Sequence, residues 1–285
     1  MSERAFDLLV IGAGMAGLAA ARKAASAGKR VAIADVRPYG GTCALRGCDP
    51  KKVLVGAADI VDAQRRMSDH GVSGETHLDW SALMAFKRTF TEPLPDRLEA
   101  SLRDVGVTTL HGPTRFVDPG AVEIETERVT AERFLIATGA RPRPLAIPGA
   151  DLVATSTEFL DLEVLPERIV FIGGGYVSLE FAHIAARAGA HVTILHRGER
   201  PLPRFDPDHV DLLVDATRGL GIDVRLETEV ASVHEQRRRT RRTHPRTATR
   251  WRPTWSCTGP VGCPTWPIWT SPAAGSTKAP TEASR

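Results

Sequence analysis

One short pattern occurs twice in this chain, and it restricts the fold more than any other feature. An apolar run at residues 6–11 is followed by GAGMAG, an Ala-rich helical stretch and a second apolar run at residues 30–35. The same order returns at residues 168–172, with GGGYVS, a helical stretch and an apolar run at residues 191–195. A strand, a glycine turn, a helix and a parallel strand form one βαβ unit. Two such units predict an α/β protein with two nucleotide-binding halves.

Composition divides the chain into three parts. A proline- and glycine-rich stretch ending at Gly149 predicts a domain boundary there. We expect a first domain at residues 1–149, an incomplete second domain at residues 150–236, and a tail without regular structure at residues 237–285. Between the two repeats, the sequence predicts a helix over residues 79–105 that is interrupted near Pro93, and short strands at residues 107–110, 114–117, 122–125 and 134–137.

The tail differs in composition from the rest of the chain. It holds nine Arg, one Lys and one acidic residue, so it carries +9 and the preceding residues carry −6 of the net +3. Its Trp residues are irregularly placed and its Arg cluster ends at Arg252, so no nucleic-acid partner is predicted. Two hypotheses stay open. The tail is a disordered extension, or a frameshift near Gln236 replaced the true continuation, because residues 253–270 read in a neighbouring frame give a strand-like run and a glycine turn.

Apolar runs and cysteine usage restrict the location of the protein. The longest apolar run, residues 8–21, is shorter than the roughly 20 residues that a membrane span requires. The N-terminus lacks a basic segment before an apolar stretch, so no signal peptide is predicted. Four Cys residues are too few for a disulfide scaffold of this length. We therefore expect a cytoplasmic protein without a membrane partner.

The first glycine turn has the pattern of a dinucleotide site. Gly12 permits a tight turn, Gly14 lets a pyrophosphate approach the backbone, and Gly17 lets the helix pack close to the strand. The helix N-terminus adds N–H donors and the positive end of its dipole. Asp35 ends the second strand, where a carboxylate can accept hydrogen bonds from ribose hydroxyls. Simple helix–strand packing also uses such turns, but the order of strand, turn, helix and acid predicts dinucleotide binding.

Two cysteines, Cys43 and Cys48, lie in CALRGC directly after the first βαβ unit. Two buried core cysteines would give the same pattern, and so would half of a metal site, although no second ligand pair lies in the first 236 residues and no metal is predicted. Redox chemistry is favoured for two reasons. The cysteines open a helical stretch, whose dipole lowers the pKa of a thiol, and Arg46 and Lys51 add positive charge.

The string GGTCALRGCDPKK after an N-terminal GxGxxG resembles the class I pyridine nucleotide–disulfide oxidoreductases, the family of glutathione reductase, dihydrolipoyl dehydrogenase and mercuric reductase. The resemblance covers residues 5 to about 235. It implies two Rossmann-like, three-layer domains, the first for FAD and the second for NAD(P), with the cysteine pair against the flavin ring. It also implies that Cys48 is the thiol nearest the flavin and that Cys43 exchanges with the substrate. Further FAD contacts that it implies are Gly41, Thr42, Ala137, Thr138 and Gly139.

The cysteine loop departs from the common family pattern. ALR replaces the usual VNV, and Asp49 stands where an apolar residue is usual. An acid beside Cys48 opposes formation of a thiolate, whereas Arg46 favours it. The net effect on the thiol pKa therefore stays open at the level of sequence.

The second glycine turn, GxGxxS, is formed by Gly173, Gly175 and Ser178. A duplicate kept only for packing would leave the same pattern. The neighbouring Tyr176 and Glu180 favour a nucleotide site. The resemblance implies that Tyr176 covers the nicotinamide pocket and that Glu180 pairs with Lys51 of the cysteine loop.

The end of the following strand predicts the kind of nucleotide. An acid there would bind the 2′-hydroxyl of NADH and repel the 2′-phosphate of NADPH, but Leu195 is followed by His196 and Arg197. Arg197 matches the family's first NADPH-selecting arginine. Arg204 lies one place beyond the second, and Arg200 is a spare candidate. We therefore predict NADPH rather than NADH, with a solvated basic loop as the alternative.

The resemblance implies a complete reaction and a longer protein. Electrons would pass from NADPH through FAD to a Cys43–Cys48 disulfide and on to a disulfide substrate, as in glutathione reductase, with dihydrolipoyl dehydrogenase and mercuric reductase as alternatives. The family's C-terminal interface domain, which forms the homodimer, has no counterpart here, and His244 is a coincidental match to its histidine. A non-catalytic, truncated flavin-binding remnant is the alternative of another class.

Overall fold

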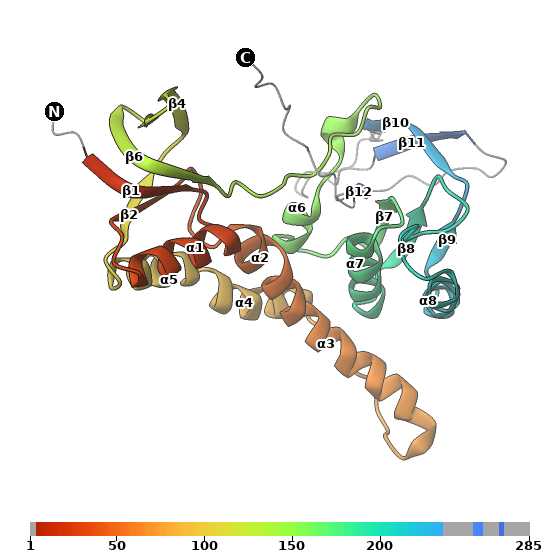
Figure 1. Cartoon of the computed structure of the whole chain (residues 1–285). Coiled ribbons are helices and arrows are strands. Elements are labelled where there is room, and N and C mark those ends of the chain that lie inside the picture. Colours follow the sequence, from red (N-terminus) through yellow and green to blue (C-terminus); the bar gives the residue numbers. More distant parts are fainter. Residues whose placement is uncertain (1–3, 236–252, 259–267, 271–285) are drawn as a thin grey trace, which may run out of the picture. The chain divides into compact units, whose positions relative to one another are not determined.

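The strand–turn–helix–strand repeat is present in both halves of the chain. The computed structural model describes residues 4–235, 253–258 and 268–270. Its backbone divides into two units, which are described separately below. Unit 1 comprises Met1–Leu54 and Ala82–Ala140, and unit 2 comprises Val55–Ser81 and Arg141–Arg285 (Figure 1).

Unit 1 is built on one six-stranded sheet with the strand order β3-β2-β1-β6-β5-β4. The strands β3, β2, β1 and β6 are parallel, and β6, β5 and β4 form an antiparallel meander. The bounds are β1 Arg4–Ile11, β2 Val31–Asp35, β3 Thr108–His111, β4 Thr114–Asp118, β5 Ala121–Ile124 and β6 Glu127–Ile136. The last strand is longer than the predicted run at residues 134–137, because the charged and exposed Glu132 and Arg133 interrupt its apolar pattern.

The helices of unit 1 include the segment that carries the cysteines. They are α1 Met15–Ser26, α2 Gly41–Arg46 and α5 Leu94–Arg103, while α3 Cys48–Met67 and α4 Trp80–Thr91 contribute residues to both units. The segment that carries the cysteines is thus two helices joined at Gly47. The predicted helix over residues 79–105 is two helices, because Pro93 occupies the N-cap of α5.

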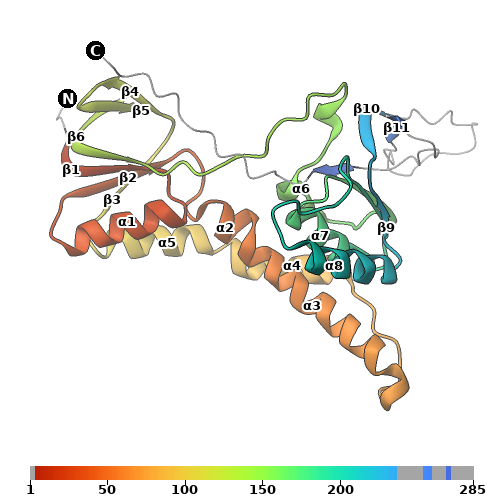
Figure 2. The ribbon, with the colours of Figure 1, turned by 45° about the vertical axis from the view of Figure 1, so that its right-hand side comes forward.

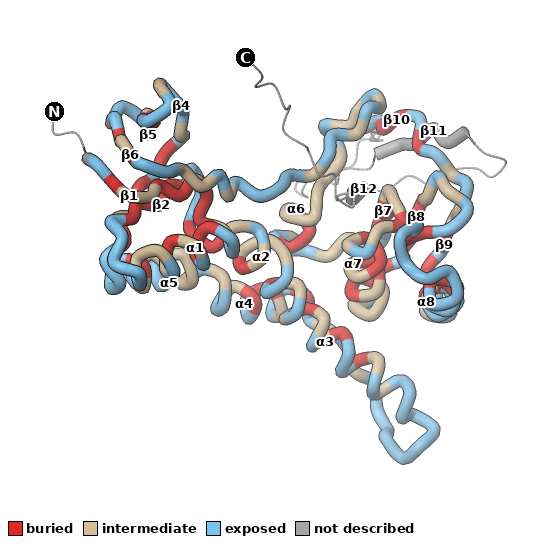
Figure 3. Tube along the Cα trace, viewed as in Figure 1, coloured by how far each residue is buried: buried red, intermediate tan, exposed pale blue. Residues whose placement is uncertain are grey.

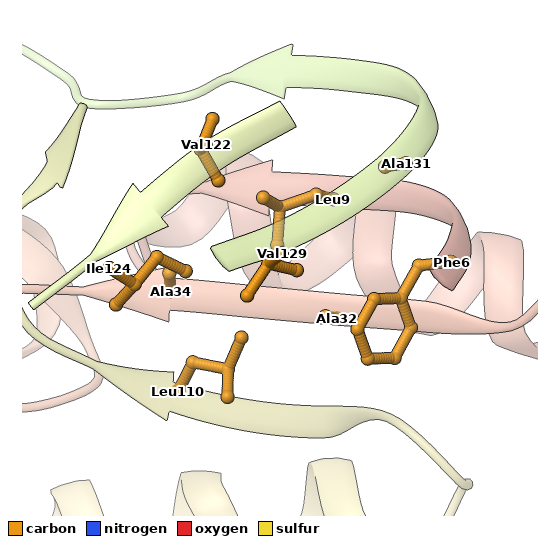
Figure 4. Close-up of a cluster of buried hydrophobic side chains, with 9 residues drawn as sticks. All are labelled: Phe6, Leu9, Ala32, Ala34, Leu110, Val122, Ile124, Val129 and Ala131. Atoms are coloured by element: carbon orange, nitrogen blue, oxygen red, sulfur yellow. The ribbon is translucent and has the colours of Figure 1, made fainter. Parts of the chain in front are cut away.

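Both faces of the parallel strands are covered, which gives unit 1 its layers. On one face α1 and α5 pack against the sheet through Val10, Leu18, Ile33 and Leu102 (Figures 1 and 2). On the other face the meander folds over the sheet, and its Val122 and Val129 meet Leu9 and Leu110 (Figure 4). Figure 3 shows the resulting band of buried residues along β1 and β2. Because both faces are apolar, β2 reads as a continuous apolar run rather than an alternating one.

Unit 2 repeats the arrangement on a smaller parallel sheet with the strand order β12-β7-β8-β9. Its strands are β7 Arg168–Ile172, β8 His191–Leu195, β9 Asp223–Arg225 and β12 Ile268–Thr270, and β10 Glu229–Glu235 pairs with β11 Pro253–Thr258 in a separate antiparallel ribbon. Its helices are α6 Ser156–Leu160, α7 Tyr176–Arg187 and α8 Pro207–Gly219, with short 3₁₀ turns at Ser68–His70 and Ala150–Leu152. The predicted strands at residues 168–172 and 191–195 are confirmed.

An aromatic cluster fills the core of unit 2. The ring of Phe159 stacks on Phe181 with centroids 4.4 Å apart, and Phe171 and Trp80 contact Phe159 at 6.0 and 5.8 Å. The Trp80 indole N–H donates to the Leu162 carbonyl at 2.9 Å, so the one polar atom of this ring is satisfied.

The division between the units lies before the predicted boundary at Gly149. The Val233 N–H donates to the Pro148 carbonyl at 2.8 Å, which ties this segment to β10 of unit 2. A side chain at Gly149 would place its Cβ 1.9 Å from the Val233 carbonyl oxygen, so only glycine permits this contact. Residues 141–149 therefore belong to unit 2.

The tail contains two segments that the structure describes, β11 and β12. The Gln236 position of the frameshift hypothesis, His244 and most of residues 237–285 lie outside the described residues, so both hypotheses on the tail stay predictions. Within the part of the chain that the structure describes, no helix has the length and apolar character needed to cross a membrane.

The glycine that packs α1 on β1 provides a test of this fold. A Cβ at Gly17 would lie 1.8 Å from the Gly12 carbonyl oxygen, so Gly17→Ala must displace the turn. We expect the substitution to lower the free energy of unfolding by about 2–3 kcal/mol. Gly56→Ala is the matched control, because Gly56 lies within α3 with open space around it, and alanine there should stabilise by up to about 1 kcal/mol. Equal destabilisation by both in urea denaturation would contradict the packing described.

Candidate functional site

The first glycine turn is fixed by backbone contacts on three sides. The Gly12 N–H donates to the Ala34 carbonyl at 2.7 Å, and the Ala137 N–H donates to the Ile11 carbonyl at 2.8 Å. Gly12 has φ +109°, and a Cβ there would lie 2.3 Å from the Ala137 carbonyl oxygen. The turn therefore requires glycine at this position, both for its conformation and for the approach of the strand end at Ala137.

These contacts bring sequence-predicted residues together at one edge of the sheet. Gly12, Asp35 and Ala137 follow or end the parallel strands β1, β2 and β6. The chain order runs from β1 to β2 and β3 on one side, while β6 lies on the other side of β1. Ligands of open parallel sheets bind at the carboxyl ends of the strands, at such a reversal of strand order. Thr138 and Gly139 follow at this edge and are exposed.

The start of α1 has the features of a phosphate cradle. Gly14 is its N-cap, no side chain caps the helix, and no acid lies in its first turn. A Cβ at Gly41 would lie 2.6 Å from the Gly14 Cα, so the two glycine backbones lie against each other without side chains between them. The N–H groups of an uncapped helix start favour an anion. The residues present thus fit the pyrophosphate of a dinucleotide.

Asp35 has a structural role that the sequence did not reveal. Its Oδ2 accepts from the Ala13 N–H at 2.7 Å, and its Oδ1 accepts from the Arg37 N–H at 2.9 Å. The carboxylate thus holds the glycine turn and the end of β2 together. Each oxygen retains a further lone pair, so hydrogen bonds from a ribose remain available to it.

Cys43 and Cys48 are close neighbours in unit 1. Cys43 lies in α2 and is half-buried, and Cys48 is the first residue of α3 and is exposed. Both are free thiols that share a hydrogen bond. A Cβ at Gly47, between the two helices, would lie 2.9 Å from the Thr42 carbonyl oxygen, so glycine permits the sharp turn that returns Cys48 to Cys43.

The structure gives a direction to one thiol pKa that the sequence left open. The hydrogen bond with Cys48 raises the pKa of Cys43 above its ordinary value, and burial and the charge of Asp49 add to this effect. The sequence left the net direction open, and for Cys43 the contacts in the structure favour the protonated thiol. The physical reason is that a shared S–H stabilises the protonated form.

Tyr39 positions the cysteine segment and was missed by the sequence analysis. Its buried hydroxyl lies 2.9 Å from the carbonyl oxygens of Ile33 and Leu110 and accepts from the Leu110 N–H at 3.1 Å. It thereby links β2 to β3 directly before Gly40 and α2. Burial raises the pKa of this hydroxyl above its usual range. A tyrosine outside any periodic pattern gives no signal of such a role.

The second glycine turn repeats the geometry within unit 2. The Gly173 N–H donates to the Leu195 carbonyl at 2.7 Å, the same distance as in the first turn. Gly175 is the N-cap of α7, which again has no side-chain cap and no acid in its first turn. Ser178, at the position of the third glycine, is buried, and its hydroxyl has no hydrogen-bond partner among the described residues. Tyr176 begins α7 and is half-exposed.

The loop between β8 and α8, residues 196–206, is the basic loop, and its three candidate arginines differ in their contacts. Arg200 binds both carboxylate oxygens of Asp211 on α8, at 2.7 and 3.0 Å, and this pairing speaks against its use as a spare phosphate ligand. Arg197 and Arg204 are exposed. The loop folds back onto the glycine turn, because the Leu202 N–H donates to the Gly174 carbonyl at 3.0 Å.

The remaining predicted residues belong to different units. Lys51 lies in α3 within unit 1, and Glu180 lies in α7 within unit 2, so their expected pairing stays a prediction. Among the described residues, no group of three or more His, Cys, Asp or Glu side chains could hold a metal ion.

The two units define an α/β protein with two Rossmann-like sheets, each with a glycine turn suited to a nucleotide, and with a thiol pair beside the first turn. The family model "Pyridine nucleotide-disulphide oxidoreductase" matches residues 6–249, and the chain belongs to this family. The resemblance seen in the sequence is thereby confirmed. Members of the family are FAD-dependent NAD(P)H:disulfide oxidoreductases.

Curated relatives extend over about twice the length of the matched region. A glutathione reductase of Burkholderia cepacia is 40% identical over 238 residues, which cover 83% of this chain and 53% of the relative. A dihydrolipoyl dehydrogenase of Mycoplasma pneumoniae is 33% identical over 233 residues, which cover 79% of this chain and 51% of the relative. The chain therefore spans about half the length of the curated relatives it matches.

A solved structure has the same fold. The Cu(II) complex of the HOCl-induced flavoprotein disulfide reductase RclA from Escherichia coli is similar with a TM-score of 0.79 and 25% identity. The match covers 96% of this chain and 57% of that chain. The Rossmann-like sheets of this protein thus correspond to part of a flavoprotein disulfide reductase.

The shared thiol hydrogen bond predicts how Cys43 reacts. Because this bond raises the pKa of Cys43, alkylation of the flavin-free chain by iodoacetamide should be slow at neutral pH and should accelerate only above the ordinary thiol range. Cys48→Ala removes the partner and should increase the rate at neutral pH several-fold. Asp49→Asn removes only the weaker charge effect and should change the rate less. Rates would be measured by mass spectrometry of the Cys43 peptide, and a rate that Cys48→Ala leaves unchanged would refute the shared bond.

Proposed function

We propose that this chain carries the FAD-binding and NADPH-binding halves of a glutathione-reductase-like disulfide reductase. The observation that carries the proposal is the thiol pair of α2 and α3 beside the Gly12–Gly17 turn, where Gly41 touches Gly14. A thiol pair joined to a dinucleotide turn in one unit supports electron transfer between a nucleotide cofactor and a disulfide. FAD, when bound, would supply the step between hydride transfer and thiol chemistry.

The FAD site would be formed entirely by unit 1. The turn at Gly12 and Gly14 and the open start of α1 would hold the pyrophosphate, and Asp35 would accept from the ribose. Gly41, Thr42 and residues 137–139 would complete the site near the flavin. Support comes from Gly14 and Gly41, whose missing side chains let the start of α2 pack directly against the uncapped start of α1.

The thiol pair would carry out exchange with a disulfide substrate. The Cys43 thiolate would attack one sulfur of the substrate, release the other as a thiolate, and form a mixed disulfide. Cys48 would then attack the Cys43 sulfur, release the second substrate thiolate and close the Cys43–Cys48 disulfide. The substrate gains two electrons, and the thiol pair loses two. Because the shared hydrogen bond keeps Cys43 protonated, a base must receive its proton for the first step.

The nucleotide of unit 2 is proposed to be NADPH. His196 stands where a carboxylate would repel a 2′-phosphate, and the neighbouring Arg197 is exposed and able to bind one. Arg204 would be the second ligand. Dihydrolipoyl dehydrogenase is the second candidate, because a relative of that name matches over a similar span. A small disulfide as substrate and a homodimer as the assembly are proposed from the family.

Selection of NADPH is tested by removing Arg197. Arg197→Ala should raise the Kd for NADPH roughly 10- to 100-fold, because a charge-assisted hydrogen bond contributes about 1.5–3 kcal/mol, and it should leave the Kd for NADH nearly unchanged. The control is Arg200→Ala, which breaks the pairing with Asp211 and should not change the ratio of the two affinities. Tighter binding of NADH than NADPH by the unaltered chain would sink the NADPH assignment.

The redox role is tested by Cys43→Ser on the flavin-loaded chain. The variant should retain flavin absorbance and reduction of the flavin by NADPH, and turnover of a disulfide should fall below detection. The control is Asp49→Asn, which preserves both thiols and should retain turnover. A yellow protein in which even the unaltered chain shows no NADPH–disulfide turnover would favour the non-catalytic remnant instead.

A further inference from the structure

The two glycine turns are held by different side chains at the same place. In unit 1, Oδ2 of Asp35 accepts from the N–H that follows Gly12, at 2.7 Å. In unit 2, Nδ1 of His196 accepts from the N–H that follows Gly173, at 3.1 Å. Both acceptors directly follow the residue whose carbonyl receives the first glycine N–H. His196 is therefore the counterpart of Asp35.

The partners of His196 define its protonation state. Nδ1 accepts from the Gly174 N–H, so it carries a lone pair and no hydrogen. Nε2 lies 2.9 Å from the Arg200 carbonyl oxygen, which can only accept, so Nε2 carries the hydrogen. The imidazole is thus neutral. Its position is restricted, because a Cβ at Gly174 would lie 3.1 Å from the ring and a Cβ at Gly198 would lie 3.0 Å from Nε2.

His196 joins the basic loop to the glycine turn. Gly174 makes two hydrogen bonds to this loop. Its N–H donates to Nδ1 of His196, and its carbonyl accepts from the Leu202 N–H. Leu202 is buried with φ +50°, a left-handed conformation that a leucine adopts only when its surroundings enforce it. The contacts of His196 and Leu202 therefore set where Arg197 and Arg204 lie relative to the turn.

We propose that His196 is a positioning residue of the pyridine-nucleotide site and acts only as a neutral imidazole. Protonation of Nδ1 would replace the acceptor of the Gly174 N–H by a second donor, so the turn and the basic loop would separate and the nucleotide would be lost. The FAD turn has no such sensitivity, because a carboxylate still accepts hydrogen bonds over the pH range in which imidazoles titrate. The inference rests on the proposed NADPH site and adds a proton dependence to it.

The charged groups near His196 are involved in other contacts. Two arginines contribute backbone contacts to it, Arg200 through the Nε2 bond and Arg225 through a carbonyl that accepts from the His196 N–H at 2.9 Å. Each is paired with an aspartate, Arg200 with Asp211 and Arg225 with Asp223. The other charged groups of the loop after β8 and of the segment after β9 are Arg197, Glu199, Arg204, Asp206 and Glu227.

Two substitutions separate the hydrogen bonds of His196. His196→Asn keeps an acceptor at the position of Nδ1 and does not titrate. His196→Gln reaches toward the Arg200 carbonyl with its amide N–H and lacks the acceptor for Gly174. The Kd for NADPH would be measured on the full, flavin-loaded chain at about pH 8 and about pH 5.5. Titration of the 2′-phosphate affects every variant equally and cancels in the ratio of their Kd values.

We expect the unaltered chain to lose NADPH affinity at the lower pH by at least about tenfold relative to His196→Asn. His196→Gln should bind weakly at both pH values. Flavin absorbance should persist at the lower pH in all three proteins and shows that unit 1 remains folded. The same pH dependence in the unaltered chain and in His196→Asn would overturn the inference.

A second measurement does not depend on nucleotide binding. ¹⁵N NMR of the unaltered chain at about pH 8, the pH at which NADPH binding is expected, should show His196 with the hydrogen on Nε2 and a bare Nδ1. The opposite tautomer, or a charged ring, would overturn the inference even if a variant fails to fold. Failure of the proposed function has a different signature, because then the unaltered chain would not bind NADPH at about pH 8 while the NMR signals of His196 were as expected.

Discussion

A backbone hydrogen bond at each glycine turn fixes the path from strand to helix within its unit. The Gly12 N–H binds the Ala34 carbonyl, and the Gly173 N–H binds the Leu195 carbonyl, both at 2.7 Å. Each bond joins the end of a first strand to the end of a second, so that the following helix starts over the carboxyl edge of the sheet. Positive φ at Gly12 and Gly173 makes this path accessible. The nucleotide sites, the cysteine segment and the basic loop are all built on these two turns.

The side chain that supports each turn distinguishes the two halves. Asp35 brings a negative charge to the first turn, which suits ribose hydroxyls, and His196 brings a neutral ring to the second. Both side chains accept from the N–H that follows the first glycine, at 2.7 and 3.1 Å, so the fold tolerates either. The electrostatic consequence differs, because only the neutral ring leaves space for a 2′-phosphate without repulsion. In the proposed function, His196 would thus both hold the turn and favour NADPH over NADH.

The thiol pair depends on contacts that lie outside its own motif. Tyr39 anchors the chain between β2 and β3 just before α2, and Gly47 allows the turn that returns Cys48 to Cys43. The shared hydrogen bond that follows raises the pKa of Cys43. The proposed exchange therefore requires removal of a proton from Cys43. The charge of the nearby Asp49 raises the pKa of Cys43 further.

The sequence by itself determined the family, the two βαβ repeats and the strands at residues 168–172 and 191–195, because apolar runs bounded by glycine turns are local signals. It also named the glycines whose missing side chains the turns require. Only the tertiary structure decided the helical form of the cysteine segment, the pairing of Arg200 with Asp211, and the roles of Tyr39 and His196. It also decided the direction of the Cys43 pKa. These properties arise from partners that are distant in sequence or brought together by turns, and hydrogen bonds through space leave no trace in a local pattern.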